Sequence, residues 1–551
     1  MCAQPAIYRL SEVQPGQHGI GRTVFKGSEV SEFDVEVLGV LDNAGPGQSI
    51  ILAKLSGGPL EETGVMEGMS GSPVYIDGRL AGAIALGFEN AKAAIAGIRP
   101  IEDMLRVSPD PDPARTAQVR RKPRASVSGT QLVELATPVS FSGFTAATLE
   151  RFAPQLRDIG FDPRQGIAGG GSPEDALGDP SSLEPGSMIS VRLMTGDMSV
   201  GADGTMTFMD NDQIYAFGHS FLSGGPTQIP FAKSDVIALL PATTASFKIS
   251  KPLEWMGVIT DDRDTGIAGI AGRRASMAPM DIAVDGKSYH MRVIDDPVMT
   301  PLLAQMAVSS ALEATERTVG PVTMHVQGQV DFMQGSLNLD RIYSGDIAVS
   351  SLAANAVASP LSFAMNSGFD ALSFAGMKIS IDTEEVRHDR GIANITGPRI
   401  ARPGEEIELK ILFTSSNGSE TVKRVRYKIP IGAQAGYINF TIADAGTIDS
   451  IDLQGATETP FRSPEQVTDL LNRRRSNTNA YLRVWRNIRN FKLEGRNLPA
   501  PPASVALILG RVAPVDTSPA AGWGSQIDQI VVSGDGNVIS GMDTFRVEVR
   551  P

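Results

Sequence analysis

The sequence predicts a mainly-β protein built from several domains. It has 551 residues, which is too long for a single hydrophobic core. Its 57 glycines and 36 prolines separate short runs rich in Val, Ile and Thr, in which apolar and polar residues alternate. Such runs between turn residues are typical of strands. A hydrophobic fraction of 42% indicates that the chain folds into compact cores.

The patterns of strands, helices and linkers divide the chain into six segments. These are a strand-rich block at 1–107, a linker with a small helix at 108–184, a second strand-rich block at 185–290, an α+β region at 291–387, a β-sandwich at 388–446, and a C-terminal helix with strands at 447–551.

In the first block, the runs from Phe33 to Leu41 and from Ser49 to Leu55 are expected to be strands, and Pro100 suits the first turn of a short helix. In the linker, "TAATLERFAPQL" is expected to be one helix. In the second block, Asp210-Asn211-Asp212 is a natural turn between two strands.

The C-terminal half mixes helices with strands. A helix is expected from Thr300, with Thr300 as its cap and Pro301 at its first position. The alternating strands of 388–446 predict a small immunoglobulin-like sandwich. Ser463 and Gln466 can form a capping box, and the helix they begin is expected to continue or re-form through "AYLRVWRNIRNF".

Composition argues against several classes of function. The net charge of -13 makes a nucleic-acid-binding surface unexpected. Cys2 is the only cysteine, which excludes an internal disulfide and a cysteine zinc site. The five histidines are scattered without an HExxH pair, so we expect neither a metal nor a cofactor. A basic helical face that binds nucleic acid is the rival interpretation for the arginines of the C-terminal segment, against a plain solvated face: Arg473, Arg474, Arg475, Arg483, Arg486 and Arg489.

No apolar run approaches the roughly 18 residues that a membrane helix needs, so no integral membrane segment is expected. No signal peptide is visible at the N-terminus. Cys2 is either incidental or the remnant of a lipidation site.

One motif suggests chemistry: "GVMEGMSGSPVYIDGRLAGAIALGF", from Gly64 to Phe88. A serine nucleophile needs a base and donors for the oxyanion. The glycine-flanked turn can direct the N–H groups of Gly68 and Ser70 at one point, although such a turn can also be purely structural. The nucleophile elbow of α/β-hydrolases fits poorly, because a strand rather than a helix follows.

The base for Ser70 must come from one of the five histidines. His219 stands in "YAFGHSF", at the expected end of a strand and beside a glycine. His18, in "GQHGIGR", also lies among glycines and is the competing candidate.

These two motifs resemble the serine and histidine segments of the SpoIVB peptidase family, over about 7–107 and 185–272. The resemblance implies that Ser70 is the nucleophile and His219 the general base. It also implies a chymotrypsin-like pair of β-barrels, formed by the two strand-rich blocks, a protein or peptide substrate, and a place outside the cell or in the bacterial envelope.

The chain departs from the family pattern in several respects. The serine precedes the histidine, which reverses the family order, and no PDZ-like segment is evident. The family's acidic position falls near Ser56, and neither Glu61 nor Glu62 is clearly its replacement. Met69 cannot form the ion pair with a new N-terminus that activates trypsin-like peptidases. The acid is therefore either absent, with a backbone carbonyl or water orienting the histidine, or one of four aspartates: Asp203, Asp210, Asp212 and Asp262.

We therefore expect a serine endopeptidase of the SpoIVB type, with Ser70 and His219 as catalytic residues and the Gly68 and Ser70 amides as the oxyanion hole. The C-terminal β-domains are expected to dock an envelope protein. The alternative is a weak or inactive peptidase-fold protein that acts as an envelope scaffold.

Overall fold

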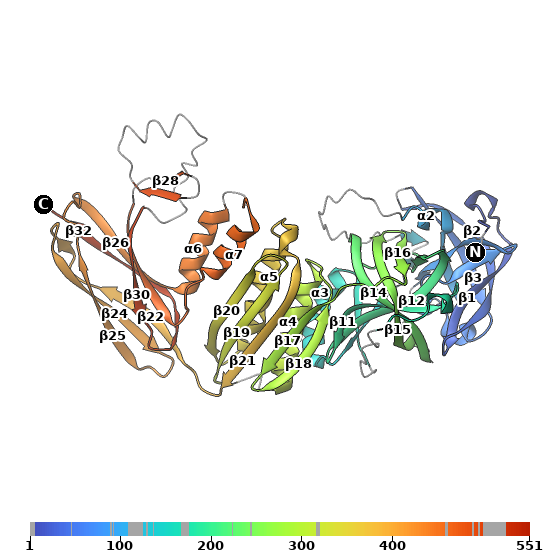
Figure 1. Ribbon diagram of the computed structural model, residues 1–551, viewed down its shortest axis with the longest axis horizontal. Coiled ribbons are helices and arrows are strands. Elements are labelled where there is room, and N and C mark those ends of the chain that lie inside the picture. Colours follow the sequence, from blue (N-terminus) through green and yellow to red (C-terminus); the bar gives the residue numbers. More distant parts are fainter. Residues whose placement is uncertain are drawn as a thin grey trace, which may run out of the picture. The chain divides into compact units, whose positions relative to one another are not determined.

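The computed structural model describes residues 6–45, 47–88, 91, 93–107, 125–127, 130–135, 137–166, 176–222, 224–242, 245–315, 320–457, 461–487, 490–493, 496–499 and 525–551. The chain forms two compact units, Met1–Asp281 with Tyr289–Ala314 and Ile282–Ser288 with Thr315–Pro551. Strands dominate both units (Figure 1), so the mainly-β prediction is confirmed. Cys2, Arg489 and 108–124 of the expected linker lie outside the described residues.

Six strands of the first unit close into a ring around one hydrophobic core. The strands pair in the order β4-β1-β2-β3-β6-β5, and β4 pairs again with β5, which closes the ring. Alternation along the strands produces the core: in β3, Ile51, Ala53 and Leu55 are buried while Lys54 and Ser56 are exposed. The six strands are β1 (His18–Lys26), β2 (Glu29–Gly45), β3 (Gln48–Ser56), β4 (Pro73–Ile76), β5 (Arg79–Phe88) and β6 (Ile95–Pro100). We call this ring the serine barrel.

A second ring follows in the same unit, and we call it the histidine barrel. Its strands pair in the order β12-β13-β16-β15-β14-β11, and β11 pairs again with β12. Two closed six-stranded rings match the double barrel that the sequence predicts. The strands are β11 (Met188–Gly196), β12 (Ser199–Asp210), β13 (Gln213–Ala216), β14 (Gly225–Leu240), β15 (Phe247–Arg263) and β16 (Gly266–Ala271).

Shorter elements surround the two rings. Strands β7 and β8 extend the serine barrel from β5, and β9, β10 and β18 extend the histidine barrel. The expected helices at 145–156 and after Pro100 are both present as α3 and α2. These elements are η1 (Leu10–Glu12), α1 (Leu60–Thr63), α2 (Ile101–Met104), β7 (Ala125–Val127), β8 (Thr130–Glu134), β9 (Thr137–Ser142), α3 (Ala146–Asp158), β10 (Phe161–Gln165), η2 (Pro180–Ser182), β17 (Ala278–Val284), β18 (Lys287–Val293) and α4 (Met299–Thr315).

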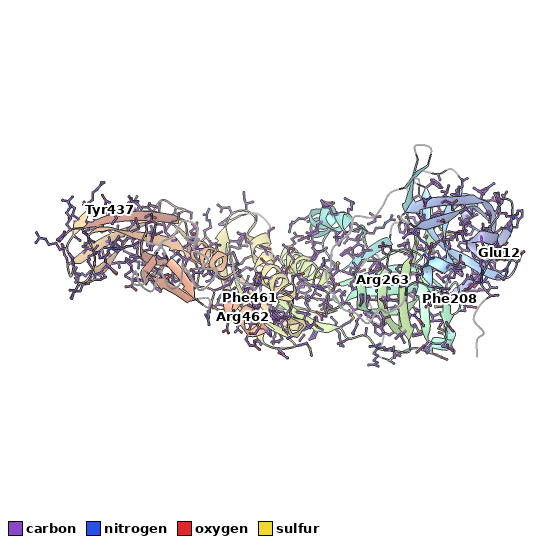
Figure 2. All side chains as sticks on the ribbon, turned by 90° about the horizontal axis from the view of Figure 1, so that it is seen from above. Glu12, Phe208, Arg263, Tyr437, Phe461 and Arg462 are labelled. Carbon is purple, nitrogen blue, oxygen red and sulfur yellow. The ribbon has the colours of Figure 1, made fainter. Side chains whose placement is uncertain are left out.

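The two barrels share a hydrophobic contact. Phe208 of β12, labelled in Figure 2, stacks on Tyr215 of β13 with ring centroids 4.6 Å apart. This pair packs with Leu80 and Ala83 of β5 and with Met104 of α2, all buried. Strand β5 is buried along almost its whole length because one face lines the serine barrel and the other faces the histidine barrel. The docked barrels hold the segments that follow Met66 and Ala216 near one another.

The second unit contains a smaller sheet and a β-sandwich. The smaller sheet has the order β21-β19-β20, with helix α5 packed against β19 and β20. Its elements are β19 (Val322–Phe332), β20 (Ser336–Gly345), α5 (Val349–Met365), η3 (Asp370–Leu372) and β21 (Phe374–Glu384).

The sandwich has sheets of order β25-β24-β22-β31 and β23-β32-β26-β27-β30 around one core. Its strands are β22 (Asp389–Thr396), β23 (Ile400–Ala401), β24 (Glu406–Ser415), β25 (Glu420–Lys428), β26 (Gly436–Asp444), β27 (Asn479–Arg486), β30 (Ser525–Ser533), β31 (Val538–Ser540) and β32 (Met542–Val549). The remaining elements are α6 (Ala445–Thr457), α7 (Pro464–Asn472), β28 (Asn490–Leu493) and β29 (Arg496–Pro499).

Three local expectations differ from the structure. The sandwich does not end at 446, because four of its nine strands come from 479–549. The segment "AYLRVWR" is strand β27 rather than helix, and its residues in the sandwich core, Ala480, Leu482 and Val484, follow a period of two. Helix α4 begins at Met299, and Asp296 rather than Thr300 caps it by accepting from two backbone N–H groups.

The expected capping box at Ser463 is also modified. Ser463 is the N-cap of α7, but its side chain makes no capping hydrogen bond to the backbone. The Gln466 side chain instead accepts a hydrogen bond from the N–H of Arg462.

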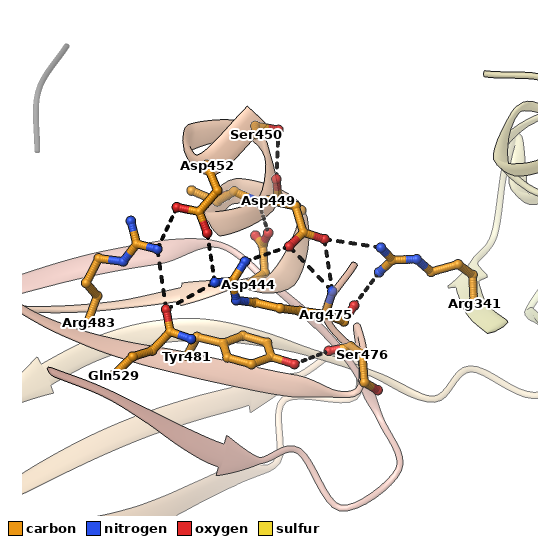
Figure 3. A network of polar contacts seen from close by, with 12 residues as sticks. Arg341, Asp444, Asp449, Ser450, Asp452, Arg475, Ser476, Tyr481, Arg483 and Gln529 are labelled. Atoms are coloured by element: carbon orange, nitrogen blue, oxygen red, sulfur yellow. Dashed lines mark hydrogen bonds and ion pairs between the residues drawn. The ribbon is translucent and has the colours of Figure 1, made fainter. Parts of the chain in front are cut away.

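The C-terminal arginines form a network of ion pairs around two aspartates of α6 (Figure 3). Arg475 donates to Asp449 at 2.9 Å and pairs with Asp452 at 2.7 Å. Arg341 pairs with Asp449 at 3.2 Å, and Arg483 with Asp452 at 2.9 Å. These contacts favour a structural role for this part of the basic cluster over nucleic-acid binding.

Candidate active site

The serine motif forms a tight turn between α1 and β4. Gly68 and Gly71 have φ angles of +91° and +92°, a region that glycine adopts without strain. A Cβ at Gly71 would lie 1.9 Å from the carbonyl oxygen of Thr205, so only glycine fits there. Ser70 lies between them and is 4% exposed. The two glycines allow this turn because they adopt positive φ without strain and, at Gly71, leave room for the backbone of the histidine barrel.

His219 follows β13 on an unusual stretch of backbone. Phe217 and Gly218 both have positive φ, +68° and +69°, which is rare for a phenylalanine. Arg99 of the serine barrel donates from Nε to the carbonyl oxygen of Gly218 at 3.3 Å. On the other side, Asp262 accepts hydrogen bonds from the N–H groups of Phe221, at 2.8 Å, and Leu222. The loop that carries His219 is therefore held on both sides.

The structure brings the two predicted residues together. Ser70 Oγ lies 2.9 Å from His219 Nε2, although 149 positions separate them in the sequence. His219 Nδ1 lies 2.8 Å from the carbonyl oxygen of Ser220. Because a carbonyl can only accept, this contact places a proton on Nδ1 and leaves Nε2 to accept the hydroxyl proton of Ser70. This is the tautomer that a general base requires.

The turn around Ser70 also leaves two backbone N–H groups, those of Gly68 and Ser70, without an acceptor among the described residues. The carbonyl oxygen of Glu67 accepts from the N–H of Lys248 at 3.3 Å, and that of Met69 accepts from Ser72 at 2.9 Å. In a trans peptide the N–H points opposite to the C=O, so these bonds turn the N–H groups of Gly68 and Ser70 the other way. No described residue accepts a hydrogen bond from either group. The pair can serve as an oxyanion hole.

The competing histidine and the other acidic candidates lie elsewhere. His18 is exposed at the start of β1. Asp203 accepts from Ser250 Oγ at 2.6 Å, and Asp210 lies at the end of β12 beside the turn that contains Asp212. Glu61 and Glu62 are exposed on α1. Of the four aspartates considered, Asp262 is the one whose hydrogen bonds hold the loop of His219.

Two buried ionisable side chains near the serine turn were not predicted. Glu67 is 5% exposed and lies 2.7 Å from Arg164, and burial raises the pKa of its carboxyl to about 7. Lys248 donates to Thr23 Oγ1 at 2.7 Å, and burial lowers the pKa of its amine to about 7. Their positions in the sequence show no motif, so only the fold identifies them.

Residues 3–105 match the SpoIVB peptidase S55 family. The matched segment contains the serine turn and all six strands of the serine barrel, so this region is similar to a SpoIVB-type peptidase domain. His219 lies beyond the SpoIVB match, and its place in the site rests on the geometry above. No curated protein and no solved structure matches the chain.

Two further properties of the described residues bear on the site. They contain no group of three or more His, Cys, Asp or Glu side chains arranged to hold a metal ion. None of the helices in the described part of the chain is both long and apolar enough to cross a bilayer.

Proposed function

We propose that this protein is a serine endopeptidase with Ser70 as nucleophile and His219 as general base. The observation that carries the proposal is the 2.9 Å contact between Ser70 Oγ and His219 Nε2. Nε2 takes the hydroxyl proton as Oγ attacks the carbonyl carbon of the scissile peptide bond. The N–H groups of Gly68 and Ser70 then stabilise the oxyanion of the tetrahedral intermediate.

The second half of the reaction uses the same groups. The proton held on Nε2 passes to the leaving amine, which leaves an acyl group on Ser70. A water molecule, activated by the now neutral His219, hydrolyses that ester and regenerates the enzyme. The carbonyl of Ser220 keeps Nδ1 protonated throughout, so a backbone group does the orienting that a carboxylate does in a full triad.

Labelling with a fluorophosphonate tests the proposal, because the probe reacts only with an activated serine. We expect the wild-type protein to be labelled at Ser70, and Ser70→Ala and His219→Ala to remain unlabelled while folded. Thr260→Val, which alters a hydroxyl of β15 outside the site, is the matched control and should be labelled normally. An unlabelled wild-type protein would contradict the proposal.

One observation favours the alternative, a peptidase-fold scaffold with little or no activity. Ser70 is 4% exposed and His219 is fully buried, so a substrate must displace covering atoms to reach them. Cleavage of a denatured protein such as casein distinguishes the two functions. Labelling without any cleavage supports the scaffold.

The proposal extends to the substrate and the location of the protein. The family match supports a protein substrate. We further propose that the protein acts in the bacterial envelope or outside the cell, where the β-sandwich docks an envelope protein. Fractionation of cells tests this location, and recovery of the protein only in the cytoplasm would overturn it.

A further inference from the structure

Three carbonyl groups of the serine turn are held by one strand of the other barrel. The N–H of Thr205, on β12, donates to the carbonyl oxygen of Ser70 at 2.8 Å. The Thr205 hydroxyl donates to the carbonyl oxygen of Gly68 at 2.9 Å. Two residues further along, the Thr207 hydroxyl donates to the carbonyl oxygen of Gly71 at 2.8 Å. Three consecutive contacts thus fix the turn from outside its own barrel.

The hydrogen bonds of the serine turn within its own barrel, such as those from Met69 N–H to Met66 and from Gly71 N–H to Ile84, do not hold the carbonyl group of Gly68. Gly68 and Gly71 have no side chains to restrict their backbone dihedrals. Met69 is buried and apolar, so it cannot hold the turn by an ion pair. Thr205 and Thr207 are fully buried, and water is therefore excluded as a substitute donor for the carbonyls that they hold.

The Thr205 hydroxyl acts on the peptide plane between the two amides of the oxyanion hole. The carbonyl of Gly68 belongs to the peptide that joins Gly68 to Met69, and the N–H groups of Gly68 and Ser70 belong to the peptides on either side. The angle ψ of Gly68 and the angle φ of Met69 join this central peptide to its two neighbours, so fixing its carbonyl restricts both angles. The Thr205 hydroxyl therefore holds the peptide that links the two donors.

We propose that Thr205 is a positioning residue that holds the oxyanion hole open, so that the site is complete only when the histidine barrel is docked on the serine barrel. This inference rests on the proposed peptidase function. It concerns a residue 137 positions from Gly68 and outside the segment that matches the SpoIVB family.

Three variants of the full-length protein test it. Thr205→Val removes the hydroxyl and keeps the shape and the backbone N–H, while Thr205→Ser keeps a hydroxyl. Thr260→Val is the matched control, since Thr260 is in the same barrel and its hydroxyl lies 3.5 Å from the carbonyl oxygen of Ala268. Stopped-flow acylation by a 4-nitrophenyl ester gives the acylation rate and the binding constant, and the burst amplitude counts active sites.

We expect Thr205→Val to acylate about 10- to 100-fold more slowly per active site, because a misdirected donor stabilises the oxyanion less. The binding constant of the ester should change by less than about twofold, and the midpoint of the pH–rate profile by less than about 0.3 pH units. Both should stay nearly constant because the hydroxyl contacts neither substrate nor His219. Thr205→Ser should recover most of the rate. Equal acylation rates in the wild type and Thr205→Val would overturn the inference.

A measurement that does not need activity separates this inference from the proposed function. Amide hydrogen exchange in the segment 66–72 should be at least tenfold faster in Thr205→Val than in Thr205→Ser or Thr260→Val, with the rest of the barrel unchanged. Unchanged exchange would overturn the role of Thr205 even if the wild type were inactive. Faster exchange with an unlabelled wild type would contradict the peptidase function alone.

Discussion

Two polar networks in this protein are built from different kinds of groups, one charged and one neutral. In the second unit, the carboxylates of Asp449 and Asp452 face the guanidinium groups of Arg341, Arg475 and Arg483 (Figure 3). In the first unit, the network around Ser70 and His219 consists of hydroxyls, backbone amides and one imidazole. The first kind of network satisfies charge with charge, whereas the second leaves a hydroxyl beside a base and two amides directed elsewhere.

This difference explains why we expect chemistry at the Ser70–His219 pair and not at the ion pairs of Asp449 and Asp452. Compensated ion pairs lower the energy of each partner and make proton transfer unfavourable, so the Asp449 network stabilises the attachment of α6. A neutral hydroxyl beside a neutral imidazole costs little to bury and remains able to react. Substitutions in the two networks should therefore affect different observables.

The largest effect is expected at the reacting pair. Ser70→Ala or His219→Ala should lower the acylation rate by about 10⁵- to 10⁶-fold, since neither residue can act without the other. The double variant should be no slower than either single variant. Active-site titration and ester acylation measure both, and additive losses would show that the residues do not act as a unit.

Asp262→Asn should have an intermediate effect. The carboxylate accepts from two backbone N–H groups, whereas an amide offers one oxygen and turns its NH₂ towards the second donor. We expect the free energy of unfolding to fall by about 2–4 kcal/mol and acylation to slow roughly 10- to 100-fold. Asp210→Asn, at the end of β12, is the control. A loss of about 10⁴-fold in a folded protein would instead identify Asp262 as the acid of a full triad.

Glu67 and Lys248 should make the stability of the first unit change with pH in opposite directions. The pKa of Glu67 is raised from 4.5 to about 7, so the folded protein retains a proton that the unfolded chain releases. Stability from this group is present below pH 4.5 and is lost as the pH rises to about 7, a change of about 3 kcal/mol. The pKa of Lys248 is lowered from 10.5 to about 7, so its contribution rises with pH between those values.

Urea unfolding at pH 4.5, 7 and 10 measures both contributions. Relative to wild type, Glu67→Gln should gain stability as the pH rises from 4.5 to 7. Lys248→Met should be more stable than wild type at pH 7, and this difference in the free energy of unfolding should shrink as the pH rises to 10. Parallel curves for wild type and variants would show that neither group titrates in the folded protein as proposed.

The smallest effect on catalysis is expected from the second unit. Arg475→Met leaves Asp449 and Asp452 with fewer partners and should destabilise this unit by about 1–2 kcal/mol. Acylation of Ser70 should stay within about twofold, because the two units have separate cores. Arg473→Met removes an exposed pair with Asp469 and should cost no more than about 0.5 kcal/mol. A large loss of acylation in Arg475→Met would contradict the conclusion that the ion-pair network and the Ser70 site act independently.

The sequence contains enough information to predict that Ser70 and His219 lie together, and to predict much of the first unit. Ser70 and His219 stand in local motifs, and glycines beside them mark the turns that carry them. Strands of the serine barrel follow from alternation, as in Ser49 to Leu55, which lies inside β3. These features depend on neighbours in the sequence, which is why they can be read without a structure.

The residues that support the site could not be predicted in the same way. Thr205 and Asp262 act through contacts with backbone groups that their own neighbours do not specify. The sandwich was also expected to be complete at 446, because alternation shows that a strand exists but not which distant strand pairs with it. In β27, Tyr481 lies between Ala480 and Leu482, and Trp485 follows Val484, so large apolar side chains occur on both faces of the strand and hide the period of two.

The 149 positions between Ser70 and His219 also matter during synthesis of the chain. At about 5–20 residues per second, roughly 7 to 30 seconds pass between the addition of the serine and the addition of the histidine. Throughout that interval the growing chain lacks the base, and for most of it the chain also lacks the strand with Thr205, so the serine hydroxyl is no more reactive than any other. Under the proposed function, the nascent protein cannot cleave itself or neighbouring proteins until its second barrel has been made.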